Sequence, residues 1–184
     1  ILGAELDCRH NSEFCGVNVL NVGAIYELMM RWLGPGDHVI AKTRVQIPTR
    51  RNEQGVQVVA TIPDHVEVLY ELANGAPVHM SFSETTGLSR GNDTWIFGNE
   101  GTIHVDNANR ILVGRVGDRE LAEHPNPPER QYRHRVEEEF INAIRGIEPV
   151  SMNTFEIGVQ YMEWTEAVHR SANQRAAVDL PMAG

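Results

Sequence analysis

Hydrophobic residues in positions 18–34 recur every three or four residues, which places them on one face of an α-helix. Asn18 is a residue type that caps helix N-termini through its side-chain oxygen. Gly34 can take the left-handed conformation that ends a helix, and Pro35 prevents its continuation. The pattern therefore predicts a helix over residues 18–34 with a buried face of Val19, Val22, Tyr26, Met29 and Leu33.

From residue 39 the period changes from helical to two, which is typical of strands with two different faces. In residues 39–47, one face carries Val39, Ala41, Thr43, Val45 and Ile47, and the other carries Ile40, Lys42, Arg44 and Gln46. Residues 65–72 and 77–84 repeat the alternation on either side of Asn74 and Gly75, which favour a hairpin turn. Further short strands are predicted at residues 2–9, 93–98, 102–106, 110–113 and 177–181.

Helical spacing returns after the proline-rich residues 124–129. One helix should carry Val136, Phe140 and Ile144 on one face and end at Gly146. Asn153 and Glu156 have the spacing of a capping box at the start of the last helix. The buried stripe of that helix is predicted to consist of Ile157, Tyr161, Trp164 and Val168.

One helix, a meander of strands and two further helices predict an α+β fold: an open, mainly antiparallel sheet with helices on one face. The other face of such a sheet would be left for a partner subunit or a missing domain. The chain has no internal repeat and no linker, so we expect residues 1–184 to form a single domain.

Composition narrows the possible partners. The 184 residues carry a formal charge of −9 with a pI of about 5.3, which disfavours binding to nucleic acid. No apolar run approaches the roughly 20 residues that cross a bilayer, and no signal segment precedes the first strand. Cys8 and Cys15 are interpreted as free thiols in a reducing cytoplasm. Because the chain begins at Ile1 without a methionine, we interpret it as a fragment or an excised domain.

Known chemical motifs are absent from the sequence. Gly34 and Gly36 have G-x-G spacing, but no further glycine completes a dinucleotide-binding loop. There is also no phosphate-binding loop, nucleophile elbow or zinc-binding HExxH. The eight histidines are scattered, and the pair His134 and Glu137 is better explained by a solvated helix face than by a metal. No metal site is therefore predicted.

Two further groups of residues allow more than one interpretation. Lys42, Arg44 and Gln46 share a strand face that could hold an anionic or hydroxylated ligand, or could face solvent or an interface. Trp32, Trp95 and Trp164 lie on apolar stripes, which favours a place in the core over a role as stacking platforms for sugar rings.

Several stretches, taken in order, resemble the C-terminal domain of the Gfo/Idh/MocA oxidoreductases, the glucose–fructose oxidoreductase and inositol dehydrogenase group. They are ILGAEL, NVLNVGAIYELMMRWLG, HVEVLYELANGAPVHMSFS, GNDTWIFGNEGTIHVD, RVEEEFINAIRGIEPVSMNTFEIGVQYMEWTEAVHRSA and AVDLP. The resemblance implies a substrate-binding and oligomerisation domain. It also implies NAD or NADP bound by an N-terminal Rossmann domain that this chain lacks, with no cofactor bound by the chain itself.

The catalytic helix of this family usually reads D-x-G-x-H. Gly23 matches the glycine, but Asn21 takes the place of the aspartate and Ile25 that of the histidine general acid/base. Isoleucine cannot transfer a proton, so three interpretations remain open. Tyr26 or His10 transfers the proton, or the protein binds a ligand without converting it. For Tyr26, a purely structural place in the core is a further alternative.

The resemblance and these residues lead to two functional hypotheses. The first is the substrate-binding half of an oxidoreductase acting on a sugar- or polyol-like small molecule, with Asn18, Asn21, Tyr26 and Lys42 contacting the substrate. The protein would be cytoplasmic and form a homodimer or homotetramer through the sheet face, with no nucleic-acid or membrane partner. The second is a catalytically inactive ligand-binding or assembly module on the same fold.

Overall fold

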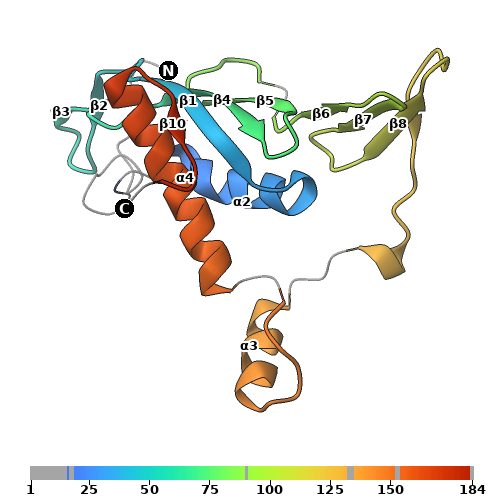
Figure 1. Ribbon diagram of the computed structural model, residues 1–184. Helices are drawn as coiled ribbons and strands as arrows, with labels where there is room; N and C mark the ends of the chain where they lie inside the picture. The colour runs from blue at the N-terminus through green and yellow to red at the C-terminus, as the bar shows by residue number, and fades with distance from the viewer. Residues whose placement is uncertain (1–15, 17–18, 90, 132–134, 152–153, 183–184) are drawn as a thin grey trace. The chain divides into compact units, whose positions relative to one another are not determined.

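A computed structural model describes residues 16, 19–89, 91–131, 135–151 and 154–182 (Figure 1). The chain divides into two compact units, one formed by residues 1–86 and 143–184, and the other by residues 87–142. The first unit contains a four-stranded sheet, a two-stranded hairpin and two long helices. The second contains another four-stranded sheet.

The main sheet of the first unit has the strand order β10-β1-β4-β5, and all of its pairs are antiparallel. The strands are β1 (Gly36–Arg44), β4 (His65–Leu72), β5 (Pro77–Ser83) and β10 (Val178–Asp179). The predicted hairpin between β4 and β5 is confirmed, with the Gly75 N–H donating to the Leu72 carbonyl at 2.7 Å. The predicted edge strand near the C-terminal end is confirmed as β10, which pairs with β1.

Helices α2 (Val22–Leu33) and α4 (Phe155–Gln174) cover one face of this sheet (Figure 1). The predicted inner faces are confirmed, because Val39, Val66 and Val68 have no exposed surface and belong to one core cluster with both helices. Tyr26 of α2 and Trp164 of α4 are buried in the same cluster. The expected α+β fold, a mainly antiparallel sheet with helices on one face, is therefore confirmed.

The starts of both helices differ from the prediction. Asn18 lies outside the described residues, and α2 begins only at Val22, after a 3₁₀ turn at Val19–Asn21. The helix begins later in the chain than predicted because Leu20 and Asn21 both have positive φ angles, 52° and 56°, which a right-handed α-helix does not contain. Asn153 also lies outside the described residues, and the N-cap of α4 is Thr154, whose Oγ1 accepts from the Ile157 N–H at 3.3 Å.

The ends of the helices agree better with the sequence. Gly34 follows α2 with φ 91° and ψ 175°, and its N–H donates to the Met30 carbonyl. This backbone region is almost reserved for glycine, although it is not the left-handed helical conformation that the sequence suggested. The short helix α3 (Val136–Ile144) ends before Gly146, as predicted, with Phe140 and Ile144 largely exposed.

A small hairpin that the sequence did not predict joins β1 to β4. It consists of β2 (Thr49–Arg51) and β3 (Gln57–Val59). Arg50 of β2 is buried and donates to Asp64, whose side chain is fully buried. Asp64 also accepts hydrogen bonds from the backbone N–H groups of Gln46 and Ile47, at 2.6 and 3.0 Å. One buried carboxylate thus holds the hairpin against the end of the main sheet.

The second unit is a meander of four strands, β6-β7-β8-β9, in chain order. They are β6 (Thr94–Phe97), β7 (Gly101–Val105), β8 (Ile111–Arg115) and β9 (Ala122–Glu123), followed by a 3₁₀ turn at Pro128–Arg130. The β6–β7 hairpin and β8 were predicted, and β9 was not. Among the described residues of 87–142, only Gly114 is buried.

The expectation of a single domain over residues 1–184 stays a prediction. None of the described helices combines the length and the apolar character that a bilayer crossing requires.

Candidate functional site

The N-terminal end of α2 is the place where the sequence predicted an active-site wall. Asn21 occupies the cap position in the left-handed conformation, and its side chain makes no capping hydrogen bond. The residue is exposed at this end of the helix. Consecutive left-handed residues without glycine, such as Leu20 and Asn21, are strained and concentrate at functional sites.

Ile25 lies one turn further along α2, beside the exposed Ala24. It is partly buried and packs against the core cluster of the first unit. At this end the helix therefore offers one hydrogen-bonding amide, Asn21, next to an apolar surface. Such a surface can position a ligand, but Ile25 cannot transfer a proton.

Tyr26 is held deep in the core. Its side chain is 2% exposed, and its ring stacks on Trp164 with the centroids 4.1 Å apart and the planes 2° apart. The ring of Tyr70 meets both in edge-on contacts at 5.8 and 5.7 Å. The hydroxyl of Tyr26 accepts a hydrogen bond from the Gly36 N–H at 2.9 Å, which ties α2 to the start of β1.

Burial raises the pKa of Tyr26, with a smaller contribution from the charge of Glu163, and the hydrogen bond from Gly36 only partly offsets this. A proton-transfer base near neutral pH needs the opposite shift. The geometry favours the structural place that the sequence left as an alternative for Tyr26. Its catalytic and substrate-binding roles stay predictions.

Lys42 lies on the other face of the main sheet, away from the helices, and is exposed. Its register partner is Glu67 of β4, which accepts a hydrogen bond from Ser81 at 2.7 Å. Nε2 of His79 and of His65 lie 2.8 and 3.0 Å from the same carboxylate. Burial raises the pKa of Glu67, but the hydrogen bonds from Ser81 and His79 and the charges of the two histidines outweigh it and lower the pKa.

The structure therefore does not bring Lys42 to Asn21, because the two residues belong to opposite faces of the first unit. The substrate-binding role of each stays a prediction. His10 and Asn18, the other candidate site residues, lie outside the described residues, as do Cys8, Cys15 and His134. In the described part of the chain, no group of three or more His, Cys, Asp or Glu side chains is arranged to hold a metal ion.

The second unit carries an aromatic group that the sequence misassigned. Trp95 was expected in the core but is 46% exposed, as is Trp32, whereas Trp164 is fully buried as predicted. The ring of Trp95 stacks on His104 with centroids 3.8 Å apart. Asp93 accepts a hydrogen bond from Trp95 Nε1 at 3.1 Å through one carboxylate oxygen and binds His104 Nε2 through the other. Alternation in a strand predicts which residues share a face, but not whether that face is covered.

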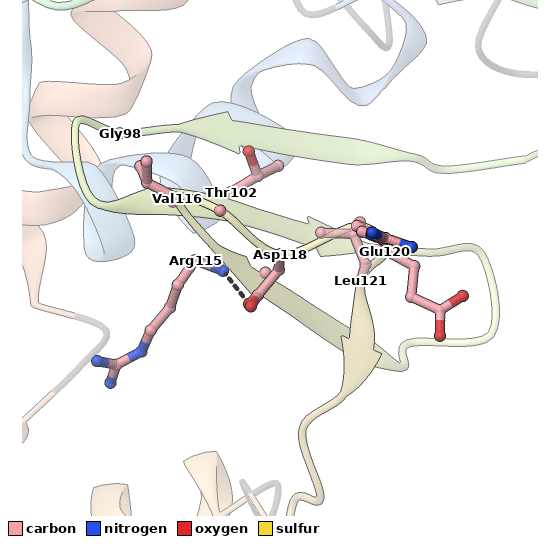
Figure 2. A pocket seen from close by; sticks show the side chains of 11 residues that line it. Gly98, Thr102, Arg115, Val116, Asp118, Glu120 and Leu121 are labelled. Atoms are coloured by element: carbon pink, nitrogen blue, oxygen red, sulfur yellow. Dashed lines mark hydrogen bonds between the residues drawn. The ribbon is translucent and has the colours of Figure 1, made fainter.

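A hollow of about 390 Å³ opens around the turn between β8 and β9 (Figure 2). Thr102, Gly114 and Leu121 contribute to its wall. Asp118 closes the turn by accepting a hydrogen bond from the Arg115 N–H at 2.7 Å, and the Arg115 side chain extends away from the hollow (Figure 2).

Solved structures of other proteins share this architecture. Levoglucosan dehydrogenase in complex with NADH and levoglucosan superposes with a TM-score of 0.79 at 21% identity, over 98% of this chain and 55% of its own. An NAD-binding oxidoreductase from Klebsiella pneumoniae gives a TM-score of 0.77 at 18% identity, again over 98% and 55%. The chain has the fold of the C-terminal domain of Gfo/Idh/MocA-type oxidoreductases.

The Gfo/Idh/MocA-type fold also occurs in a protein named for repression. A super-repressor mutant of Gal80p from Saccharomyces cerevisiae matches with a TM-score of 0.70 at 13% identity, over 96% of this chain and 54% of its own. The chain thus spans about half the length of each of these three proteins. No family model matches the sequence, and no curated protein is significantly similar to it.

Proposed function

We propose that this chain is the substrate-binding and oligomerisation half of an NAD(P)-dependent oxidoreductase that acts on a sugar- or polyol-like substrate. NAD or NADP would be bound by a separate nucleotide-binding domain, and the chain would contribute the N-terminal end of α2 as one wall of the active site. A cytoplasmic location and the absence of nucleic-acid and membrane partners belong to the same proposal.

The observation that carries the proposal is the agreement in fold over nearly the whole chain with levoglucosan dehydrogenase, a protein solved with NADH and a sugar. The exposed amide of Asn21 and the strained backbone before it support the assignment of the wall to this end of α2. Asn21 would orient a substrate hydroxyl, and Ala24 and Ile25 would pack against the apolar side of the ring. Tyr26 and His10 remain the two candidates proposed for proton transfer.

A second candidate function is a catalytically inactive ligand-binding or assembly module. Ile25 at the position of the family's general acid/base favours it, and so does the similarity to Gal80p, a protein named as a repressor. In this case the cofactor and the sugar would be bound as ligands without turnover. Both functions share the same fold and differ only in the chemistry at the end of α2.

The first experiment concerns the cofactor. NADH and NADPH are titrated against the 184-residue chain by fluorescence and calorimetry, and we expect no binding. Stoichiometric, tight binding of either nucleotide would refute the proposal that a separate domain, and not this chain, binds the cofactor.

The second experiment separates the two candidate functions. The full-length polypeptide is assayed with NAD and NADP against a panel of sugars and polyols. Turnover of any member supports the oxidoreductase, whereas bound cofactor without turnover supports the inactive module. An Ile25→His variant of the full-length polypeptide then tests whether this position faces the reacting atoms. If it does, the rate of turnover should rise, because a general acid/base in place contributes about 10²- to 10⁴-fold to the rate.

The proposal includes self-association into a homodimer or homotetramer through a sheet face. Sedimentation of the chain over a range of concentrations tests it. A species whose mass stays that of a monomer at all concentrations would contradict this part of the proposal.

A further inference from the structure

The tight turn between β4 and β5 contains Asn74 followed by Gly75, and both residues are exposed. An asparagine followed by glycine deamidates more readily than other asparagines, because no side chain shields the glycine nitrogen from the asparagine amide. Gly75 also has a φ of 83°, a conformation that residues with a side chain rarely adopt. The fold thus requires glycine at the one position that makes Asn74 reactive.

The side chain of Asn74 is held close to the backbone nitrogen with which it would react. Its Oδ1 accepts a hydrogen bond from the Ala76 N–H at 3.0 Å. Because Gly75 lies between these two residues, the bond keeps the carboxamide beside the Gly75 nitrogen. A donor at Oδ1 also withdraws electron density from Cγ and favours the attack of a nucleophile on that carbon. The two reacting atoms are therefore neighbours before the reaction begins.

The carboxylate of Glu71 lies next to Gly75. A Cβ added to Gly75 would lie 3.7 Å from Glu71 Oε1. The other carboxylate oxygen, Oε2, lies 3.9 Å from Nε2 of His38 on the neighbouring strand β1. A carboxylate close to an N–H group can take its proton as the nitrogen attacks, which is general base catalysis. Glu71 is thus placed to assist a reaction of the Gly75 nitrogen.

One pair of hydrogen bonds opposes this reaction. The Gly75 N–H donates to the Leu72 carbonyl at 2.7 Å, and the Leu72 N–H donates to the Ala76 carbonyl at 2.9 Å. While the first bond exists, the Gly75 proton is not available to Glu71. Exposed turns open locally more often than the strands that they join. The reaction therefore proceeds when the turn opens briefly while β4 and β5 stay paired.

We propose that Asn74 and Gly75 form a site of spontaneous deamidation at which Glu71 acts as the general base. The Gly75 nitrogen bonds to Asn74 Cγ while its proton passes to the Glu71 carboxylate. The Cγ–Nδ2 bond then breaks, and ammonia leaves with that proton. Water opens the resulting succinimide ring at either carbonyl, which leaves aspartate or isoaspartate at position 74. The inference does not depend on the proposed function.

Both products should loosen the turn. The new carboxylate lies in the same turn as Glu71, and two like charges repel each other. In isoaspartate, the main chain also runs through the side-chain carbons, which lengthens the backbone of the turn. We therefore expect the hydrogen bonds between Leu72, Gly75 and Ala76 to weaken as the protein ages.

The first test locates the modification. The 184-residue chain is incubated at neutral pH, and peptide mass mapping and an isoaspartate-specific methyltransferase measure the products at each asparagine. Asn52 is the matched control in the same chain, because its Oδ1 also accepts from the N–H two residues on, that of Gln54, at 3.1 Å, but Glu53 follows it. We expect products at position 74 and none at position 52 over the same period. Equal rates at the two positions, or no product at position 74, would overturn the inference.

The second test concerns the base. We expect Glu71→Gln to slow the reaction at Asn74 in the folded chain by roughly 10-fold, which is less than a fully positioned base contributes in an enzyme. Glu120→Gln, at an exposed glutamate of the second unit, should leave the rate unchanged. In urea, wild type and Glu71→Gln should react at the same rate, because unfolding separates the carboxylate from Gly75.

Two outcomes of this comparison decide against Glu71. A rate that is unchanged or higher in the folded Glu71→Gln variant would show that the carboxylate does not take the proton. A difference that persists in urea would show that the effect does not come from the folded turn. Circular dichroism and thermal unfolding confirm that each variant is folded before its rate is measured.

Discussion

At the scale of single residues, Tyr26 shows how one side chain can suggest chemistry and yet serve packing. Its hydroxyl is committed to the Gly36 N–H, its ring is stacked on Trp164, and burial raises its pKa. These contacts join α2, α4 and the start of β1, so the residue holds three elements of the first unit together.

Replacing Tyr26 by phenylalanine separates the two roles. We expect Tyr26→Phe to lower the free energy of unfolding of the chain by about 1 kcal/mol, because the Gly36 N–H loses its acceptor. If Tyr26 serves packing alone, turnover by the full-length protein should be retained. A fall in kcat of about 10²-fold or more, measured with the folded variant, would instead assign the proton transfer to Tyr26.

Asp64 is the residue whose charge matters most clearly for stability. Burial by itself raises the pKa of its carboxyl group, but hydrogen bonds from Gln46, Ile47 and Arg50 and the charge of Arg50 outweigh this and lower the pKa. The pKa of an aspartate in an unfolded chain is about 3.9. The ionised form therefore stabilises the folded state above that pH, and this stabilisation is lost as the pH falls through the lower folded-state pKa.

Asp64→Asn tests this dependence. We expect a loss of about 2 kcal/mol at pH 7, since buried Arg50 loses the carboxylate at 3.1 Å and keeps only that of Glu84, at 3.5 Å. Urea denaturation at pH 7 and at pH 3 measures the effect, and the difference between wild type and variant should shrink at the lower pH. Glu53→Gln, an exposed residue in the nearby β2–β3 turn, serves as the control and should change little. A loss that is equal at both pH values would contradict the assigned role of the charge.

At the scale of elements, the helix and strand periodicities predicted the main parts of the fold and the faces that they bury. The β2–β3 hairpin escaped prediction because its strands are three residues long and owe their place to the Arg50–Asp64 pair, a contact over 14 positions. The start of α2 was misplaced because nothing in the apolar spacing reveals the left-handed backbone of Leu20 and Asn21.

The candidate site followed from the sequence only in part. Resemblance placed Asn21 and Ile25 on one helix, and the structure adds that Asn21 is exposed at the end of that helix. Tyr26, Tyr70 and Trp164 lie on three different apolar faces predicted from the sequence. The spacing of apolar residues does not predict which of these faces pack against one another. For Trp95, a hydrophobic residue on a regular strand face is equally compatible with a core and with an interface.

Replacing glycine by alanine should have opposite effects on stability at the end of one helix and in the interior of another. Gly34 has φ 91° and ψ 175°, so Gly34→Ala should cost about 1–2 kcal/mol even though an added Cβ would meet no atom within 4 Å. Gly158 lies within α4, also with open space around an added Cβ, so Gly158→Ala should stabilise the chain by about 0.8 kcal/mol. Thermal unfolding of both variants measures the two effects, and equal signs would contradict this account.

At the scale of the whole molecule, the two units differ in how they are stabilised. The first unit contains a core cluster in which Val39, Val66 and Trp164 are completely buried. The described residues of 87–142 bury only Gly114. A sheet that buries so few side chains therefore gains little hydrophobic stabilisation of its own.

Ser171 of α4 links this helix to strand β1 of the first unit through its hydroxyl group. Its buried hydroxyl accepts from the Ala41 N–H at 2.8 Å and donates to the Ala176 carbonyl at 2.6 Å. Ser171→Ala leaves both groups without this partner, and we expect a loss of about 2 kcal/mol in urea denaturation. Ser81→Ala on the exposed face of β5 is the matched control and should cost about 0.5 kcal/mol or less. Equal losses in the two variants would show that the link to β1 is unimportant.

The position of β10 beside β1 has a consequence for how the protein is made. Strand β1 is synthesised before its edge partner β10 and before Ser171, whose hydroxyl accepts from the N–H of Ala41, 130 residues earlier. During translation β1 therefore waits with one edge unpaired and open to other nascent chains. The main sheet of the first unit should therefore be completed only once β10 has been synthesised, and chaperones should protect the growing chain until then.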